Sequence, residues 1–356
     1  MNLVEIDGSQ GEGGGQILRT SVSLSCILGI PVKISKIRAG RKEPGLRPQH
    51  LEAIKSAAEI SDSKLIGAKV GSTEIELYPG EPTKSVRKKI DTRTAGSVTL
   101  IAQTLIPIGL FRNLDLDLEI TGGTEVPASP TIDYLQKVVV PIYRRLGGEV
   151  EIDLKRRGYY PKGGGVIQVQ VGGSNSKPRP LKFETPPQNL SLDANIFASS
   201  SNLPSHITSR ETESAKALLL QSGVRVIESQ VNSTNNSLSP GTSILIFRQN
   251  DFEYVGASGL GERGRKSEDV GTEAARSFLS ETSGRPNLDS HLADMAVTLL
   301  SCINGESLFT TSKITNHLET NLKVASKMTG TNFIVSKISE RNAYEVKLSG
   351  LAEKPI

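Results

Sequence analysis

Apolar residues recur along the chain with two spacings that alternate. Helical spacing marks residues 96–105 and 131–146, and shorter apolar runs typical of strands cover 114–120 and 165–171. Gly147-Gly148 ends the second helix, as expected for a C-cap. Strands alternating with helices and closed by a hairpin give the order βαβαββ, which predicts a mixed α/β (α+β) fold.

This order is repeated. Leu24-Ser25-Cys26-Ile27-Leu28-Gly29 and Leu300-Ser301-Cys302-Ile303-Asn304-Gly305 share one pattern. Each precedes a β-type stretch, at 32–37 and 308–312, and then a helix opening His-Leu-Glu, at His50 and His317. With the copy between them, this predicts three βαβαββ repeats. Their closing strand pairs are expected at 64–70 with 74–78, 149–154 with 165–171, and 332–337 with 343–348.

A separate block interrupts the repeats. It holds its own predicted strands (191–198, 224–230, 243–248) and helices (206–221, 268–281), and its edges at 178–180 and 283–286 have linker composition. We therefore expect residues 1–182 to form repeats one and two of the main domain, 183–280 a smaller inserted α/β domain, and 281–356 the third repeat.

Composition limits the class of protein. A chain of 356 residues with 36% hydrophobic residues, 4% aromatics and no Trp predicts two aliphatic cores. The longest apolar stretch, 98–111, is too short to span a bilayer, and residues 1–7 lack signal-peptide character. We expect no membrane partner and a cytoplasmic location.

Charge and cysteine usage add two limits. Only Cys26 and Cys302 are present, which excludes a disulfide framework and an all-cysteine zinc site and predicts two buried thiols. The net charge of +4 is weaker than that of a protein gripping duplex through many phosphates. Contact with nucleic acid should therefore be local.

Two loops in the first repeat could bind phosphate. Residues 11–16, Gly-Glu-Gly-Gly-Gly-Gln, lie between a strand and the helix carrying Arg19, so backbone N–H groups could approach an anion, and Glu12 could hold a divalent ion. The spacing matches neither the P-loop nor the dinucleotide fingerprint, and a tight turn is the alternative. Residues 37–50 place four cationic side chains before His50; the alternative is a solvated basic loop.

Two further loops indicate a binding site less specifically. Residues 155–165 combine cations with two tyrosines, which favours single-stranded RNA, although an ordinary hairpin explains them equally well. Residues 261–267 superficially match a P-loop. Since Arg265 stands between glycine and lysine and no suitable strand leads into the segment, we interpret it as a loop and a helix start.

Candidate chemistry in the third repeat lies in two segments. His291-Leu292-Ala293-Asp294-Met295 precedes the predicted helix: His291 could lie on a nucleobase and Asp294 could accept hydrogen bonds from ribose, adenine or a metal-bound water, or cap the helix. Asn316-His317-Leu318-Glu319 begins the next helix. There the dipole disfavours imidazolium, so His317 could attack a phosphorus atom, the alternative being a capping or packing role.

Taken together, residues 11–19, 37–50, 122–124, 157–165, 292–294 and 316–317 closely resemble the RNA 3′-terminal phosphate cyclase family. The resemblance covers nearly the whole chain and implies the same plan of three repeats with an insertion. It implies ATP-dependent conversion of an RNA 3′-phosphate to a 2′,3′-cyclic phosphate through a histidine–AMP intermediate and an RNA(3′)pp(5′)A intermediate. The reaction belongs to the ligase class and needs Mg²⁺ or Mn²⁺.

The resemblance also implies roles for particular residues. His317 would be the nucleophile and Glu12 the metal ligand beside the nucleotide. The phosphate and RNA surface would comprise Arg19, Arg38, Arg41, Gln49 and His50. The adenylate site would comprise Gln103, His291, Leu292, Ala293, Asp294 and Met295. His291 stands where relatives often have Tyr, which still allows stacking on adenine, and Met295 stands where Gln is frequent, which removes a polar contact to the nucleotide.

Two other functions fit parts of the pattern. A noncatalytic cyclase-like ribosome-biogenesis factor would bind RNA without forming an adenylate, but such relatives lack the nucleophilic histidine that is present here. An enolpyruvyl-transferase-like enzyme shares the repeats but acts on small acids, and fold alone does not decide function. The physiological RNA, expected to be single-stranded, and the oligomeric state are left open by the sequence.

Overall fold

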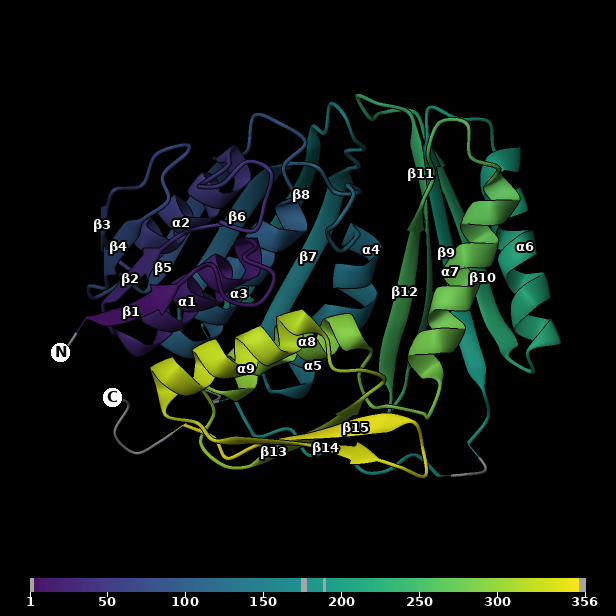
Figure 1. Ribbon diagram of the computed structural model, residues 1–356. Coiled ribbons are helices and arrows are strands. Elements are labelled where there is room, and N and C mark those ends of the chain that lie inside the picture. Colours follow the sequence, from purple (N-terminus) through teal and green to yellow (C-terminus); the bar gives the residue numbers. More distant parts are fainter. Residues whose placement is uncertain (1–2, 174–177, 188–189, 352–356) are drawn as a thin grey trace.

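The computed structural model describes residues 3–173, 178–187 and 190–351 (Figure 1). Met1 and Asn2, part of the N-terminal stretch considered above, lie outside this range. No described helix is long and apolar enough to cross a membrane. Both cysteines are free and buried, as predicted.

The first two repeats have the predicted βαβαββ order. Repeat one runs β1 (Val4–Asp7), α1 (Gly15–Leu28), β2 (Val32–Ser35), α2 (Pro48–Ile60), β3 (Lys64–Ile66) and β4 (Ile75–Tyr78). Repeat two runs β5 (Ser85–Asp91), α3 (Val98–Arg112), β6 (Asp115–Gly122), the helical segments α4 (Ile132–Tyr134), η1 (Leu135–Val139) and α5 (Val140–Arg145), β7 (Glu149–Arg156) and β8 (Gly165–Gly172). Their sheets have equivalent strand orders, β1-β2-β4-β3 and β5-β6-β8-β7.

The third repeat differs from the prediction. It runs α8 (Ser290–Leu300), β13 (Ser307–Thr311), α9 (Asn316–Thr329), β14 (Phe333–Ile338) and β15 (Ala343–Leu348), in a sheet of order β13-β15-β14. The position of its first strand is shared by two short segments. Lys182 and Leu288 each form an isolated parallel bridge to β13, one before and one after the insertion. The insertion therefore interrupts this strand.

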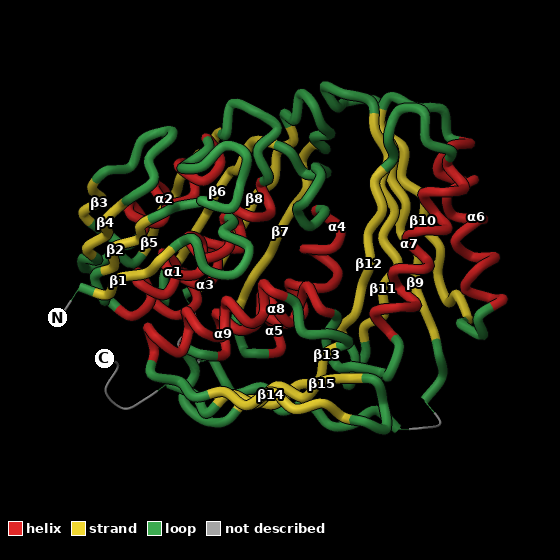
Figure 2. The backbone as a smooth tube through the Cα atoms, in the orientation of Figure 1, coloured by secondary structure: helices red, strands yellow, loops and turns green. Residues whose placement is uncertain are grey.

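Helices of all three repeats share one core. α1 packs against α2, α3, α8 and α9, and a single cluster of buried aliphatic side chains extends from Ile6 to Leu348. The helices lie together between the sheets (Figure 2). Loops from different repeats thereby meet at the ends of these helices.

The inserted segment has a second core. It comprises β9 (Asp193–Ser201), α6 (His206–Gln221), β10 (Arg225–Thr234), β11 (Gly241–Gln249), β12 (Tyr254–Leu260) and α7 (Ser267–Thr282), with sheet order β10-β9-β11-β12. α6 and α7 cover one face of this sheet around Phe278. The other face meets α4 and η1, where Lys137 lies 4.8 Å from the centroid of the Phe197 ring.

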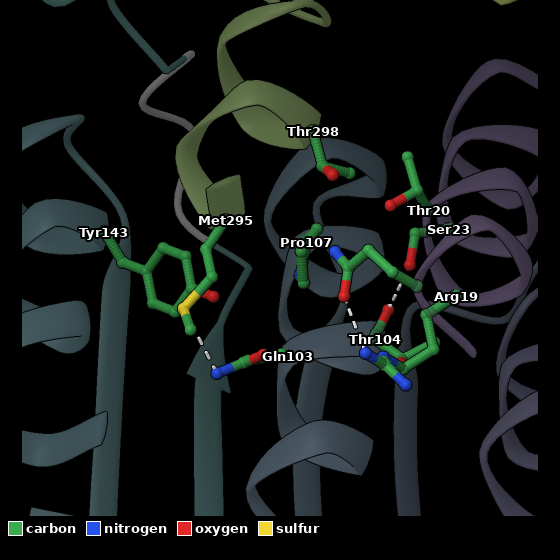
Figure 3. A pocket seen from close by; sticks show the side chains of 10 residues that line it. Arg19, Thr20, Ser23, Gln103, Thr104, Pro107, Tyr143, Met295 and Thr298 are labelled. Atoms are coloured by element: carbon green, nitrogen blue, oxygen red, sulfur yellow. Dashed lines mark hydrogen bonds between the residues drawn. The ribbon is translucent and has the colours of Figure 1, made fainter. Parts of the chain in front are cut away.

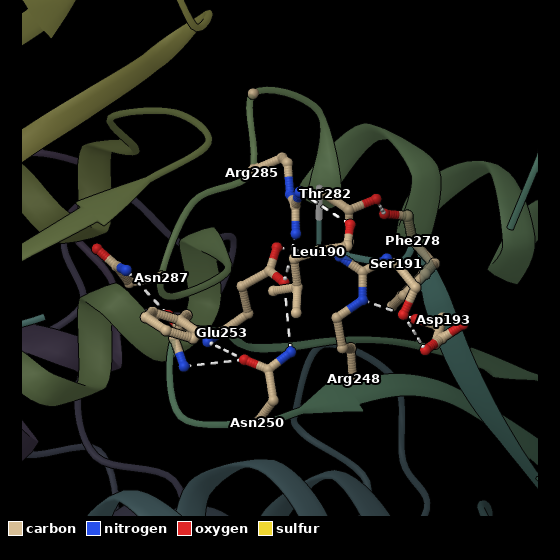
Figure 4. Close-up of polar contacts among 12 residues, drawn as sticks. Leu190, Ser191, Asp193, Arg248, Asn250, Glu253, Phe278, Thr282, Arg285 and Asn287 are labelled. Carbon is tan, nitrogen blue, oxygen red and sulfur yellow. Dashed lines mark hydrogen bonds and ion pairs between the residues drawn. The ribbon is translucent and has the colours of Figure 1, made fainter. Parts of the chain in front are cut away.

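The edges of the insertion are fixed, which differs from their linker-like composition. Buried Glu253 pairs with Arg248 at 3.0 Å and with Arg285 at 3.4 Å, and Arg285 also donates to the carbonyls of Pro187 and Leu190 (Figure 4). Asn287 donates to the carbonyls of Glu184 and Phe252. These contacts join the start, the middle and the end of the insertion.

Three elements correct the sequence interpretation. α3 continues to Arg112 through Pro107, because the helix is buried and its burial offsets the missing N–H donor. The predicted helix 131–146 contains the π-helical turn η1, followed by Pro141, which cannot donate to the preceding turn. β12 was not predicted, because Gly256 and Gly259 interrupt its apolar pattern. A Cβ at Gly259 would lie 3.3 Å from the Cβ of Ala274, so glycine lets α7 approach.

Candidate active site

A large cleft lies where the three repeats meet the inserted segment. Its volume is about 840 Å³. Of the residues expected at a nucleotide or phosphate site, the cleft is lined by Glu12, Arg19, Arg41, Gln103, His291, Asp294, Met295 and His317. Residues separated by up to 305 positions are thus brought together around one space.

His317 stands at the second position of α9, where the sequence pattern predicted a helix start. The N-cap is Thr315, whose hydroxyl accepts from the Leu318 N–H at 2.9 Å. The side chain of His317 is 37% exposed, and Nε2 lies 3.3 Å from Oε2 of Glu12. The imidazole is therefore accessible from the cleft and is not buried in the apolar core.

The surroundings favour the neutral imidazole. Partial burial lowers the pKa of His317, the Glu12 carboxylate opposes this, and the cationic Arg19 and Arg41 lower the pKa further. The net shift is downward from the ordinary value of 6.5. At neutral pH the imidazole is thus largely unprotonated, so one of its ring nitrogens can offer a lone pair.

The Gly-rich loop opens α1 toward the same space. The N-cap Gly14 makes no side-chain cap, and there is no acidic residue in the first turn. A Cβ at Gly14 would lie 2.9 Å from Nη2 of Arg41, and Arg41 pairs with Glu12 at 3.2 Å. Because residue 14 is glycine, Arg41 of the cationic 37–50 loop can lie against the start of α1. The two loops together form a basic wall beside Glu12.

Asp294 lies inside a helix, so the expectation that residues 291–295 precede the helix is wrong. α8 begins at Ser290 and is capped by Asp289, which accepts from the N–H groups of His291 and Leu292. Asp294 instead accepts from the Thr315 hydroxyl at 2.6 Å. Burial raises its pKa to about 7. Asp294 thus links α8 to the cap of the helix that carries His317.

Only part of the 291–295 segment faces the cleft. Leu292 and Ala293 are at most 1% exposed and pack in the core, so their side chains do not line the space. Gln103 donates to the sulfur of Met295 at 3.3 Å, and Figure 3 shows these two side chains meeting beside Tyr143. Arg19 lies nearby and donates to Gln16 at 2.6 Å.

Arg38, Gln49 and His50 lie next to the cleft and do not line it. Arg38 donates to the carbonyls of Glu43 and Gly45, which shapes its loop. Gln49 accepts from the Ser97 N–H at 2.9 Å. Burial, together with Arg19, Arg38 and Arg47, lowers the pKa of His50 to about 3, so His50 can contact phosphate only as a neutral donor.

Sequence patterns missed residues that line the cleft from the inserted segment and the loop before α9. Arg276 projects from α7 and is exposed, and Lys313 pairs with Glu281 at 2.8 Å. Small residues Gly256, Ala257 and Ser258 of β12 form another part of the wall. Only the three-dimensional packing of the insertion reveals them, because they belong to no phosphate-binding motif.

The P-loop-like segment 261–267 is a loop and helix start, as predicted, since α7 begins at Ser267. The reason given was partly wrong, because β12 leads directly into this loop. Among described residues, no group of three or more His, Cys, Asp or Glu side chains could hold a metal ion. A metal would therefore depend on Glu12 together with oxygens of a bound ligand.

Comparison with known proteins agrees with this geometry. Residues 10–335 match the family model for RNA 3′-terminal phosphate cyclase. Proteins named RNA 3′-terminal phosphate cyclase from Thermococcus kodakarensis and Thermococcus gammatolerans are 43% and 41% identical over 341 residues, which is 94% of this chain and 95% of each relative. The protein of that name from Pyrobaculum neutrophilum is 38% identical over 347 residues, covering 97% of this chain and 98% of the relative. The chain belongs to the RNA 3′-terminal phosphate cyclase family.

Proposed function

We propose that this protein converts an RNA 3′-terminal phosphate to a 2′,3′-cyclic phosphate at the expense of ATP, with His317 as the nucleophile. The observation that carries the proposal is the position of Nε2 of His317, 3.3 Å from Glu12, at a helix start in a cleft walled by Arg19 and Arg41. A neutral nucleophile, an anion-binding wall and a carboxylate are thus available at one point.

In the first step Nε2 attacks the α-phosphorus of ATP. A P–N bond forms, the bond to the β-phosphate oxygen breaks, and pyrophosphate leaves. Arg19 and Arg41 are suited to balance the charge of the phosphates because guanidinium groups donate paired hydrogen bonds. Covalent catalysis divides one difficult displacement into easier ones.

In the second step an oxygen of the RNA 3′-phosphate attacks the adenylate phosphorus. The P–N bond breaks, the imidazole is regenerated, and RNA(3′)pp(5′)A forms. The adjacent 2′-hydroxyl then attacks the phosphorus that is bonded to the 3′-oxygen of the RNA, AMP leaves, and a proton is released. Ring closure is favoured because the hydroxyl and the phosphate belong to the same ribose.

We propose that the adenosine lies between Gln103, His291 and Met295, and that Mg²⁺ or Mn²⁺ binds beside Glu12. A single exposed carboxylate fits an ion that takes its other oxygens from triphosphate and water. Such an ion supplies charge neutralisation at the phosphates. Glu12→Gln removes the negative charge that would hold this ion, so it is expected to raise the metal concentration needed for adenylation.

The test is a paired assay of His317→Asn and His206→Asn with a short RNA ending in a 3′-phosphate. His206 is exposed and also stands at a helix start, at the first position of α6, so it is a matched control. We expect His206→Asn to form cyclic phosphate at the wild-type rate and His317→Asn to form none. Cyclic product from His317→Asn at more than about 1% of the wild-type rate would reject the assignment.

A wild-type protein that binds this RNA but forms neither cyclic phosphate nor adenylate would instead support a noncatalytic family member. Binding can be followed by fluorescence anisotropy in the same samples. The two outcomes are therefore separated by one set of measurements.

A further inference from the structure

The loop between β7 and β8 has a buried half and an exposed half. Arg157 and Tyr159 are each 3% exposed. Arg157 pairs with the buried carboxylates of Glu125 and Asp133, and the Tyr159 hydroxyl lies 3.3 Å from that of Ser199 in the inserted sheet. These two residues of the motif are therefore structural and join repeat two to the insertion.

The exposed half presents an aromatic ring. Tyr160 is 64% exposed, and its side chain has no polar or ring partner among the described residues. Leu238, which is 51% exposed and comes from the loop before β11, lies against Gly164 of the loop between β7 and β8. A Cβ at Gly164 would lie 2.3 Å from Cδ1 of Leu238, and the Lys162 N–H donates to Ser239 at 3.2 Å. The tips of repeat two and of the inserted segment thus form one surface.

This surface continues to the predicted phosphate loop. A Cβ at Gly163 would lie 2.7 Å from the Cα of Ala95, so the 92–96 loop lies directly against it. A Cβ at Gly96 would lie 2.8 Å from the Cβ of Gln49, and Gln49 also accepts from Ser97. The 92–96 loop therefore lies between Gln49, beside the cleft, and the loop that carries Tyr160.

The charge along this path is mainly positive, although the exposed Asp91 accepts from the Arg93 N–H at 2.8 Å. Segments 92–97, 154–164 and 231–248 contain no Asp or Glu. Arg93 and Lys162 are exposed, and in the described parts of the chain their side chains have no partner. We call Arg93, Tyr160, Lys162 and Leu238 the tip surface.

We infer that the tip surface binds the single-stranded part of the RNA that precedes its 3′-phosphate, with Tyr160 stacking on a base and Arg93 and Lys162 contacting backbone phosphates. A lone exposed ring flanked by unpaired cations is the arrangement that holds single strands. A protein partner would require a larger apolar patch. The inference rests on the proposed function and extends it by assigning a second contact region to the substrate.

The test compares Tyr160→Ala, Tyr160→Phe and Lys162→Ala for binding of two RNAs that end in a 3′-phosphate. One is a dinucleotide and the other a single-stranded decamer. Ile334→Ala and Lys337→Ala serve as controls, because both residues are exposed on β14, at the opposite end of the molecule (Figure 1). Covalent adenylation with ATP alone is measured for every variant.

We expect Tyr160→Ala to weaken decamer binding by roughly fivefold or more, the equivalent of one base–aromatic stack. Tyr160→Phe should bind as the wild type does. Lys162→Ala should lower the slope of log affinity against log salt by about 0.7, the loss of one phosphate contact with a single strand. Dinucleotide binding and adenylation should be unchanged in all variants.

Unchanged decamer affinity in Tyr160→Ala and Lys162→Ala, with adenylation intact, would overturn this inference and leave the proposed function standing. Equal losses for the decamer and the dinucleotide would also overturn it, because they would indicate disturbance of the 3′-phosphate site. Failure of the wild type to form an adenylate would reject the proposed function, whatever the tip variants do.

Discussion

At the scale of single residues, the reactivity of His317 depends on its protonation. Burial, Arg19 and Arg41 lower the pKa of His317, while Glu12 opposes the shift. The neutral form, which the proposed function requires as the nucleophile, is therefore retained as pH falls below the ordinary value of 6.5 and is lost only as pH passes the lowered pKa. We expect the acid limb of the adenylation rate to lie below pH 6.5.

The substitution Arg41→Gln should move this limb to higher pH. It removes a positive charge that disfavours imidazolium and frees Glu12, paired with Arg41 at 3.2 Å, to stabilise imidazolium more strongly. Both effects raise the pKa of His317. NMR titration can follow it directly, since the chain has only four histidines. An equal or lower pKa in Arg41→Gln, with Lys337→Gln as the distant control, would contradict this explanation.

The two duplicated His-Leu-Glu segments diverge at this scale. His50 is buried, and its Nδ1 accepts from the Arg47 N–H at 3.3 Å, whereas His317 faces the cleft beside Glu12. Sequence similarity predicted that both begin helices, which is correct. It could not predict which of the two would be accessible, because accessibility depends on side chains from other repeats.

At the scale of elements, the start of α9 positions His317, the proposed nucleophile. Thr315 caps this helix and donates to Asp294 on α8. Asn321, one turn beyond His317, donates to the Asp294 carbonyl at 2.7 Å and accepts from Thr20 on α1 at 2.9 Å. Three helices from two repeats thus hold the first turns of α9.

Thr315→Val should loosen this arrangement. It removes the N-cap, worth about 1 kcal/mol, and leaves buried Asp294 without its donor, at a cost of about 1 kcal/mol or more. We expect the free energy of unfolding in urea to fall by about 2 kcal/mol and adenylation to slow. Thr315→Ser keeps the hydroxyl and should restore both. Loss of adenylation in Thr315→Ser equal to that in Thr315→Val would argue against a role for the hydroxyl.

Periodicity predicted most elements but not those with conflicting local signals. α1, α2, α6 and α9 were predicted because their local sequence signals agree with the helices that form. α3 was predicted too short because burial overrides the effect of Pro107. α8 was placed too late, since Asp289 rather than Asp294 is its cap. The two misses have different causes: tertiary burial overrides a local signal in α3, whereas in α8 one acidic residue was taken for the cap in place of another.

At the scale of the whole molecule, the insertion is held by a buried ionic junction. Arg285→Ala removes contacts to Glu253, Pro187 and Leu190 and leaves Glu253 with Arg248 as its remaining guanidinium partner (Figure 4). Because a buried carboxylate loses a partner, we expect a loss of about 2 kcal/mol in stability. Arg276→Ala, an exposed arginine on α7, should leave stability unchanged. Equal denaturation midpoints for Arg285→Ala and the wild type would contradict this.

The cleft itself illustrates the limit of sequence inference. The motifs predicted Glu12, Arg41, Asp294 and His317 individually, and the structure brings them together. The wall formed by β12 and α7 could not be foreseen, since it follows from how the insertion docks on α4 and η1. Residues that reach the cleft only because the insertion packs against repeat two have no local sequence pattern that marks them.

Whether His317 carries the AMP group can be decided by mass spectrometry of the protein incubated with ATP and Mg²⁺, without RNA. We expect one added adenylate, mapped to the peptide containing residue 317, lost in acid as expected for a phosphoramidate, and absent from His317→Asn. An adenylate on another residue, or one that persists in His317→Asn, would show that His317 is not the nucleophile.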